Sequence, residues 1–252
     1  MKVAVLLGLA FAAVAAGMAQ EVPVDLSGSW ALLLTTSEYW SVPFMGEQRR
    51  VGQSVVRLTI EQNGFELMLN EFRYCLALVD TGTPFVRVNI SPRFYSSIRV
   101  GPVQGRLEQD SETFQLVVPP FVALNGVRLS DPFSERLPQN PSDPRVVDSD
   151  GDGKPGVTTQ ITVLGLISGE AYVVQRSMLS LKGTVVSPDL IQGLLTWKDE
   201  QVTLAATSSF LVQSAQGRPD PVLENSYFIL RRIIGNKTCE EIIALFADRL
   251  RR

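Results

Sequence analysis

Apolar and polar residues alternate with a period of two along most of the chain. Residues 55–61 place apolar side chains at even positions and polar ones at most odd positions, and residues 65–70 alternate again after Asn63 and Gly64. A two-residue period is typical of a strand buried on one face, and Asn-Gly is a common pair in tight hairpin turns. These residues therefore predict a β-hairpin.

Further alternating segments are short and are separated by Gly, Pro, Asn, Asp and Ser. The folded part begins at Gly28, and strands are predicted at residues 72–79, 85–90, 97–100, 103–109, 113–118, 122–129, 157–166, 171–181, 190–197, 201–212 and 226–234. Short strands at this spacing favour a large antiparallel barrel or sandwich. The predicted fold class is all-β, with one helix at the C-terminal end.

The period changes to that of a helix near the C-terminus. Thr238 and Glu241 have the spacing of a capping box, which predicts a helix over residues 238–250. Its apolar face consists of Cys239, Ile242, Ile243, Phe246 and Leu250. We expect this face to pack on the sheet.

The first residues have the pattern of an export signal. Lys2 precedes a small and apolar run over residues 3–16, and residues 17–19 supply small side chains for cleavage between Ala19 and Gln20. The run is shorter than the roughly 20 residues that span a bilayer, although an uncleaved anchor is the alternative. The prediction is a signal peptide at 1–19 and a single β domain at 20–252, exported to the periplasm or outside the cell.

Two cysteines, Cys75 and Cys239, occur in this exported chain. An even number of cysteines in an oxidising compartment predicts a disulfide, and the alternative is a pair of buried free thiols. The bond would close a long loop, for which chain entropy suggests about 5 kcal/mol as an upper figure. It would pin the C-terminal helix to the sheet.

Composition removes several classes of function. The chain has no histidine, which excludes Ser-His-Asp and Cys-His catalysis and histidine-bound zinc. Its 23 basic and 26 acidic residues are spread without a basic block, so nucleic acid is not an expected partner. No later segment has the apolar length of a transmembrane helix.

A long loop rich in Pro, Asp, Asn and Ser interrupts the strands at residues 130–156. Within it, Asp148, Asp150 and Asp152 alternate with small residues and precede Gly153. Alternating oxygen ligands followed by glycine are typical of loops that wrap calcium. The three aspartates are therefore the candidate metal ligands, and the alternative is a solvated acidic turn without an ion.

These six residues resemble the calcium loops of EF-hand, dockerin and thrombospondin type 3 proteins. The resemblance implies monodentate aspartates at the three positions and a turn at the glycine. The twelfth position, a bidentate acid in EF-hands, is Thr159 here, and Pro155 occupies the eighth position. The loop is therefore not an EF-hand, and an ion would need further ligands such as Asp143 or the Ser149 carbonyl.

Gly28 and Trp30 resemble the G-x-W motif that begins the lipocalin fold. The resemblance implies a barrel whose tryptophan closes one end and packs against an arginine from a late strand, Arg231 or Arg232. These arginines and Arg176 fall in predicted strands, where they face either solvent or a cavity.

Three functions remain open. The first is a non-enzymatic carrier of a small apolar molecule or lipid, with lipocalin-like architecture. The second is a calcium-stabilised extracellular module that binds a protein surface, for which Tyr39, Trp40 and Phe44 are candidate contacts if they are not core residues. The third is a hydrolase with two carboxylates about 5–10 Å apart in a cleft. We expect a binding or structural protein rather than an enzyme.

Overall fold

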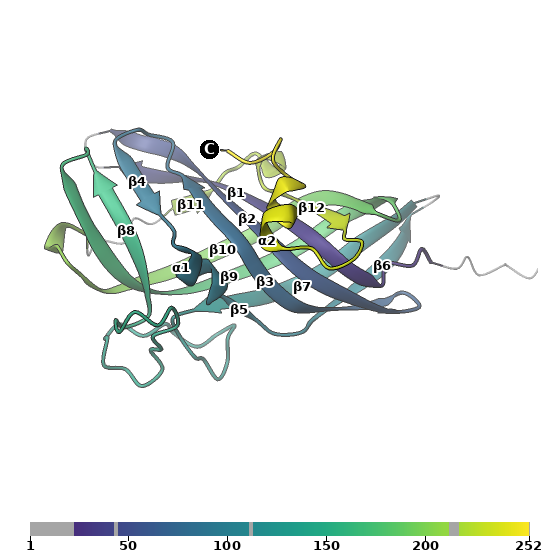
Figure 1. Ribbon diagram of the computed structural model, residues 1–252, viewed down its shortest axis with the longest axis horizontal. Coiled ribbons are helices and arrows are strands. Elements are labelled where there is room, and N and C mark those ends of the chain that lie inside the picture. The colour runs from purple at the N-terminus through teal and green to yellow at the C-terminus, as the bar shows by residue number, and fades with distance from the viewer. Residues whose placement is uncertain (1–22, 43–44, 111–112, 212–216, 252) are drawn as a thin grey trace, which may run out of the picture.

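The structure is a computed structural model that describes residues 23–42, 45–110, 113–211 and 217–251. The strands in these ranges form one antiparallel sheet of 12 strands. Figure 1 shows this sheet with a short helix near the C-terminus packed on its outside. No helix in these ranges is long and apolar enough to cross a membrane. The predicted signal peptide lies outside the described residues.

The elements follow one another along the chain in this order. They are β1 (Gly28–Val42), β2 (Gly46–Asn63), β3 (Glu66–Asp80), β4 (Val86–Asn89), α1 (Pro92–Ser96), β5 (Arg99–Val100), β6 (Val103–Asp110), β7 (Thr113–Asn125), β8 (Val157–Val163), β9 (Ile167–Ser187), β10 (Leu190–Ala206), η1 (Ser209–Leu211), β11 (Gly217–Pro219), η2 (Leu223–Asn225), β12 (Tyr227–Arg232) and α2 (Cys239–Ala244).

Eight strands pair in a closed ring. Its order is β9, β10, β12, β1, β2, β3, β6 and β7, and pairing of β7 with β9 completes it. The strands β4, β8, β5 and β11 extend the sheet beyond this ring. The predicted all-β class is confirmed, and the sheet is ring-like rather than a regular barrel or two packed layers.

Several strands are longer than the alternation predicts, because bulges break the two-residue period without ending the strand. β3 runs through Glu71, whose φ is +55°, and β7 continues past Pro119 and Pro120 with a register shift between Val118 and Phe121. β10 is likewise one strand, although residues 190–197 and 201–212 were predicted as two.

The predicted hairpin is confirmed as β2–β3, but its turn lies one residue later. Asn63 pairs with Glu66, so Gly64 and Phe65 form the two-residue loop. Gly64 has a φ of +61°, which suits glycine at the first central position of a tight hairpin.

One end of the ring is filled by an apolar core. Trp30 is fully buried there, and its indole Nε1 donates to the Leu26 carbonyl at 2.8 Å. Arg232 packs over the Trp30 ring, as the lipocalin resemblance implied. The core around them comprises inward-facing residues such as Leu32, Leu58, Ile60, Leu69, Leu116, Leu181, Phe228 and Leu230.

The helix α2 covers the outer face of the sheet. The Sγ atoms of Cys75 and Cys239 lie 2.02 Å apart, at disulfide distance, and the predicted capping box of Thr238 and Glu241 is present. The α-helix ends at Ala244 rather than at residue 250, because the backbone continues in turns such as that closed by the Phe246 amide on the Ile243 carbonyl.

The aromatic residues proposed as a surface cluster do not form one. Trp40 is buried, its Nε1 donates to the Thr81 carbonyl, and the Arg50 guanidinium stacks over its ring. Tyr39 lies beneath Arg218, and Phe44 is outside the described residues. Trp40 is therefore a core residue, and it packs with Val86 on β4 and Ile161 on β8.

Candidate binding cavity and acidic loop

The ring is least tightly closed between β3 and β7. β3 pairs with β6 only from Glu66 to Leu69, so its second half has no strand partner on that side. The helix α1 and the following residues occupy this gap. Ser91 caps the helix and Phe94 is buried beneath it. This helix was not predicted, because five residues with one buried side chain give no helical period.

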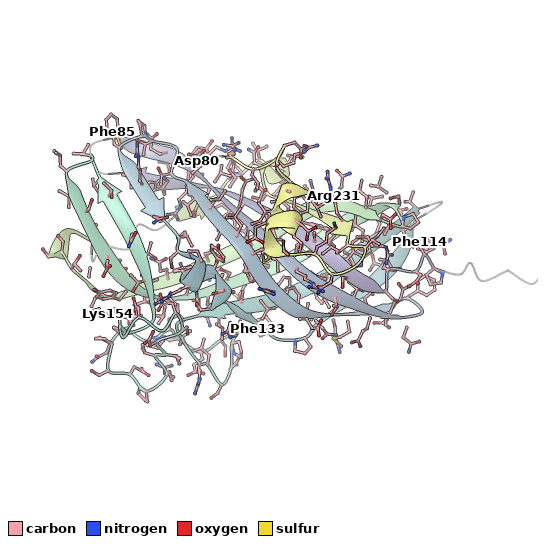
Figure 2. All side chains as sticks on the ribbon, viewed as in Figure 1. Asp80, Phe85, Phe114, Phe133, Lys154 and Arg231 are labelled. Atoms are coloured by element: carbon pink, nitrogen blue, oxygen red, sulfur yellow. A yellow bond between two sulfur atoms is a disulfide. The ribbon has the colours of Figure 1, made fainter. Side chains whose placement is uncertain are left out.

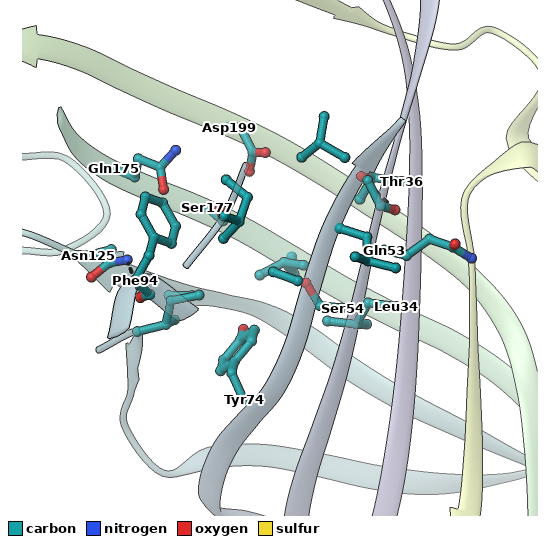
Figure 3. A pocket seen from close by; sticks show the side chains of 18 of the residues that line it. Leu34, Thr36, Gln53, Ser54, Tyr74, Phe94, Asn125, Gln175, Ser177 and Asp199 are labelled. Carbon is teal, nitrogen blue, oxygen red and sulfur yellow. Dashed lines mark hydrogen bonds between the residues drawn. The ribbon is translucent and has the colours of Figure 1, made fainter. Parts of the chain in front are cut away.

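A cavity of about 180 Å³ lies inside the ring behind α1. Figure 3 shows its lining, which comes from β1, β2, β3, β7, β9, β10 and α1. Its apolar walls include Leu34, Phe94, Ile98, Ala123 and Leu179. Its polar lining includes Thr36, Ser54, Tyr74, Asn125, Ser177 and Asp199. The interior of the ring thus combines an apolar core with this cavity.

Asp199 is the charged side chain of this lining. It faces inward because it continues the alternation of Leu195 and Trp197 along β10. Its side chain is accessible to water and yet surrounded by protein, as expected for a group that points into an internal cavity. Burial raises the pKa of Asp199 to about 6, although a hydrogen bond from Ser177 on the neighbouring strand opposes this.

Tyr74 faces the same cavity from β3. The residue is 8% exposed, and no described group accepts or donates a hydrogen bond at its hydroxyl. Burial and the nearby charge of Asp199 both raise the pKa of Tyr74, so the phenol stays protonated at neutral pH. Its hydroxyl is available to a ligand as donor or acceptor.

Glu38 and Arg50 lie one step farther along the inward faces of β1 and β2. They form an ion pair with each other, and the Arg50 guanidinium also lies 5.2 Å from the Trp40 ring centroid. Glu38 raises and Arg50 lowers the pKa of Asp199. Because Arg50 is already paired, it does not neutralise Asp199.

Asn125 fixes α1 over the cavity. Its Nδ2 donates to the Phe94 carbonyl at 3.0 Å, and its Oδ1 lies 2.6 Å from the Ser97 hydroxyl oxygen. Both side chains are 3% exposed, so these bonds are made away from bulk water. The end of β7 thereby holds the helix against the opening of the ring.

The cavity lining contains a single carboxylate among the described residues, that of Asp199. A carboxylate hydrolase needs two such groups across the scissile bond. The nearest inward-facing acid, Glu38, is held by Arg50. Among the described residues, the cavity therefore lacks the second carboxylate that the predicted hydrolase would need.

The long loop lies outside the ring, where Figure 2 labels Phe133 and Lys154. Arg176, which projects outward from β9, is 5% exposed and donates to the carbonyls of Pro132 and Glu135 at 3.0 and 2.7 Å. It also pairs with Glu200. This arginine faces neither solvent nor the cavity but anchors the loop to the sheet.

The three predicted metal ligands do come together in this loop. Each of Asp148, Asp150 and Asp152 offers a carboxylate oxygen, and these oxygens lie within 4.8 Å of one another. Asp148 accepts from the backbone amides of Gly151, Asp152 and Gly153, and these bonds outweigh burial and lower its pKa. Asp148 therefore shapes the turn.

Asp150 is the least satisfied of the three. Its Oδ2 accepts from the Thr158 amide at 2.9 Å, whereas its Oδ1 is buried without a hydrogen-bond partner. Burial raises the pKa of Asp150, and the charges of Asp152 and Asp148 raise it further. An orphaned carboxylate oxygen next to two other carboxylates fits a cation better than it fits an empty turn.

Asp143, which was suggested as a further ligand, is engaged elsewhere. Its carboxylate binds Arg145, with 2.7 Å between Oδ2 and Nη2, and this pairing lowers its pKa to about 2. The Ser149 amide donates to the Gly156 carbonyl and closes the base of the loop.

The sequence predicts the residues of the acidic loop, whereas for the carrier it predicts an interior cavity without naming the residues that line it. The sequence does contain a pattern that predicts an inward-facing Asp199, since Leu195, Trp197 and Asp199 alternate along one face of a strand. The predicted strands at 190–197 and 201–212 leave out the charged run Lys198-Asp199-Glu200, whereas in the structure β10 continues through it. No protein-family model, curated protein or solved structure matches this chain.

Proposed function

We propose that the chain is a non-enzymatic binding protein that holds a small molecule in the cavity behind α1. The observation that carries this proposal is a hollow with apolar walls and a few convergent polar groups, of which the Tyr74 hydroxyl has no hydrogen-bond partner among the described residues. Ligand sites are typically concave and mostly apolar with a small number of oriented polar groups.

The size and lining of the cavity restrict the ligand. At about 180 Å³ it is smaller than the roughly 300–1,000 Å³ that drug-sized molecules occupy. A long lipid chain does not fit that volume, and an ionised carboxylate does not suit a wholly apolar ligand. The ligand is a compact molecule with an apolar body and a polar group, which modifies the apolar ligand expected from the sequence.

Export remains part of the proposal. The apolar run at residues 3–16 and the cysteine pair at disulfide distance both support an oxidising compartment. A binding protein in that space would meet solutes before they reach the cytoplasm.

Filling the cavity tests the proposal. Ala77 lines it, and Ala247 lies exposed in the turns after α2, so Ala77→Phe and Ala247→Phe make the same change inside and outside. Native mass spectra of the disulfide-bonded chain would be recorded with a mixture of small aromatic amines, alcohols and acids. We expect adducts with the wild type and Ala247→Phe but not with folded Ala77→Phe. Equal adducts on all three would contradict binding in the cavity.

A second candidate function is calcium binding by the acidic loop, which the buried Oδ1 of Asp150 favours. The ion would rigidify the long loop, and extracellular sites of this kind bind calcium with Kd of about 0.1–1 mM. Asp148 is a poor position for a test, because its three backbone hydrogen bonds stabilise the turn with or without an ion.

The discriminating variant is Asp150→Asn, with Asp143→Asn as the matched control. We expect calcium to raise the melting temperature of the wild type and of Asp143→Asn, and Asp150→Asn to remove most of that increase. In EDTA, Asp150→Asn should be at least as stable as the wild type, since it removes a desolvated charge. A melting temperature of the wild type that does not respond to calcium would contradict the site.

A further inference from the structure

The cavity carries an unbalanced negative charge. Asp199 lies on β10 and faces Ser177 on β9, Tyr74 on β3, and the Glu38–Arg50 pair on β1 and β2. Glu38 and Arg50 together contribute no net charge. Asp199 therefore adds one formal negative charge to the interior whenever it is ionised.

Among the described residues, the groups that face Asp199 offset this charge only in part, because Arg50 acts on it together with Glu38. Ser177 and Tyr74 are uncharged at neutral pH, and the Arg50 guanidinium is engaged by Glu38 and stacked on Trp40. A water-accessible carboxylate that points into a cavity lined by aromatic rings is a suitable counter-ion for a cationic ligand.

The surroundings of the carboxylate suit an organic cation. Tyr74 and Phe94 place two aromatic rings on the lining of the same small cavity, and Leu179 adds an aliphatic wall. Aromatic faces attract cations, and a carboxylate accepts charge-assisted hydrogen bonds from an ammonium group. The Asp199 carboxylate, the two aromatic rings and Leu179 come from four different elements: β10, β3, α1 and β9.

We propose that the ligand of this cavity is a small primary amine in its ammonium form, with Asp199 as its counter-ion and the Tyr74 and Phe94 rings against its apolar body. This inference rests on the proposed function, since it names the class of molecule that the cavity binds. An anion of the same size is excluded by repulsion from Asp199.

Three probes of one shape test the charge preference: benzylammonium, benzyl alcohol and benzoate. Each would be titrated into the ¹⁵N-labelled, disulfide-bonded mature chain at a pH above the Asp199 pKa of about 6. We expect benzylammonium to shift the amide signals of residues around Tyr74, Phe94 and Ser177. Its affinity should exceed that of benzyl alcohol by roughly tenfold or more, because hydrogen bonds to charged groups are the strong ones.

Two variants assign the preference to Asp199. Asp199→Asn keeps the shape and removes the charge, and Glu61→Gln removes an exposed carboxylate on β2 outside the cavity. Asp199→Asn should bind benzylammonium and benzyl alcohol about equally, whereas Glu61→Gln should behave as the wild type. Should Asp199→Asn fail to fold, the wild type still provides a test, because benzylammonium affinity should fall as the pH drops through about 6 while benzyl alcohol affinity stays constant.

The outcomes separate the two proposals. Binding of benzyl alcohol or benzoate in the cavity as tightly as benzylammonium would overturn the amine assignment and leave the binding function standing. An undiminished preference in folded Asp199→Asn would do the same. Absence of any shift at the cavity with all three probes would overturn both proposals.

Discussion

The Arg232 guanidinium lies 4.6 Å from the centroid of the Trp30 ring and joins the last strand of the sheet to the first. Its Nη1 donates to the Ser27 carbonyl at 2.6 Å, and its Nη2 donates to the carbonyls of Asp25 and Pro188 at 2.7 and 2.9 Å. One side chain thus ties the segment before β1, the turn before β10 and the ring core together.

Replacing Arg232 tests this arrangement. We expect Arg232→Met to lower the free energy of unfolding by about 2–4 kcal/mol, because several charge-assisted hydrogen bonds and a cation–π contact are lost. Arg232→Lys should recover only part of this, since an ammonium cannot reproduce the planar fork. Urea denaturation would measure both. Asp189→Asn is the control, because the Asp189 carboxylate, which pairs with Arg232, is 69% exposed and should contribute little to stability.

Reduction of the Cys75–Cys239 pair should loosen α2. We expect Cys75→Ala/Cys239→Ala to lose about 2–5 kcal/mol of stability, the usual cost of removing a disulfide. Ile242 and Phe246 should remain docked, because both are buried against the sheet. Hydrogen exchange of the α2 amides would show this, and full exchange in the folded variant would contradict the expected docking.

The pH dependence of stability should carry the signature of Asp199. Its folded pKa of about 6 exceeds the unfolded value of about 3.9, so the folded chain holds this proton more tightly. The resulting stabilisation is fully present below the unfolded pKa and is lost as the pH rises through about 6.

Asp199→Asn removes this dependence. The variant should therefore melt close to the wild type near about pH 4 and above it near about pH 8. Thermal denaturation of both proteins at the two pH values measures the difference, and Glu61→Gln serves as the control. The same difference at both pH values would show that the Asp199 pKa is not raised by folding.

The anchoring of α1 depends on Asn125. We expect Asn125→Ala to cost about 1–3 kcal/mol, because the buried Ser97 hydroxyl and Phe94 carbonyl each lose one of their hydrogen-bond partners. Amides of residues 94–98 should exchange faster, since the helix then loses its hydrogen bonds to the end of β7. Ser96→Ala, which alters an exposed hydroxyl of the same helix, should have almost no effect.

Alternation in the sequence was sufficient to predict the all-β class, because most strands bury one face. The positions of several strand ends could not be predicted. Glu71 and the Pro119-Pro120 pair read as breaks, yet both sit in bulges that the neighbouring strands stabilise. The turn at Gly64 and Phe65 is shifted because the strands, rather than Asn63, fix the register.

The two candidate sites differ in how far they can be predicted. Asp148, Asp150 and Asp152 are consecutive alternating residues, so their convergence is a local property of the loop. The cavity depends on Tyr74 and Asp199, which are remote in sequence and meet only when the ring closes. The gap beside β3 that makes room for α1 follows from tertiary pairing alone.

The pairing of β1 with β12 has a consequence for how the chain folds. β1 pairs with β2 and also with β12, so the ring cannot close until Tyr227–Arg232 is available, close to the end of the chain. Such non-local pairing places a sheet protein among slow folders, with times of about milliseconds to seconds. With the export that we propose, the polypeptide would pass unfolded through a narrow channel before its last strand pairs, and it would complete its hydrogen-bonded ring only on the far side.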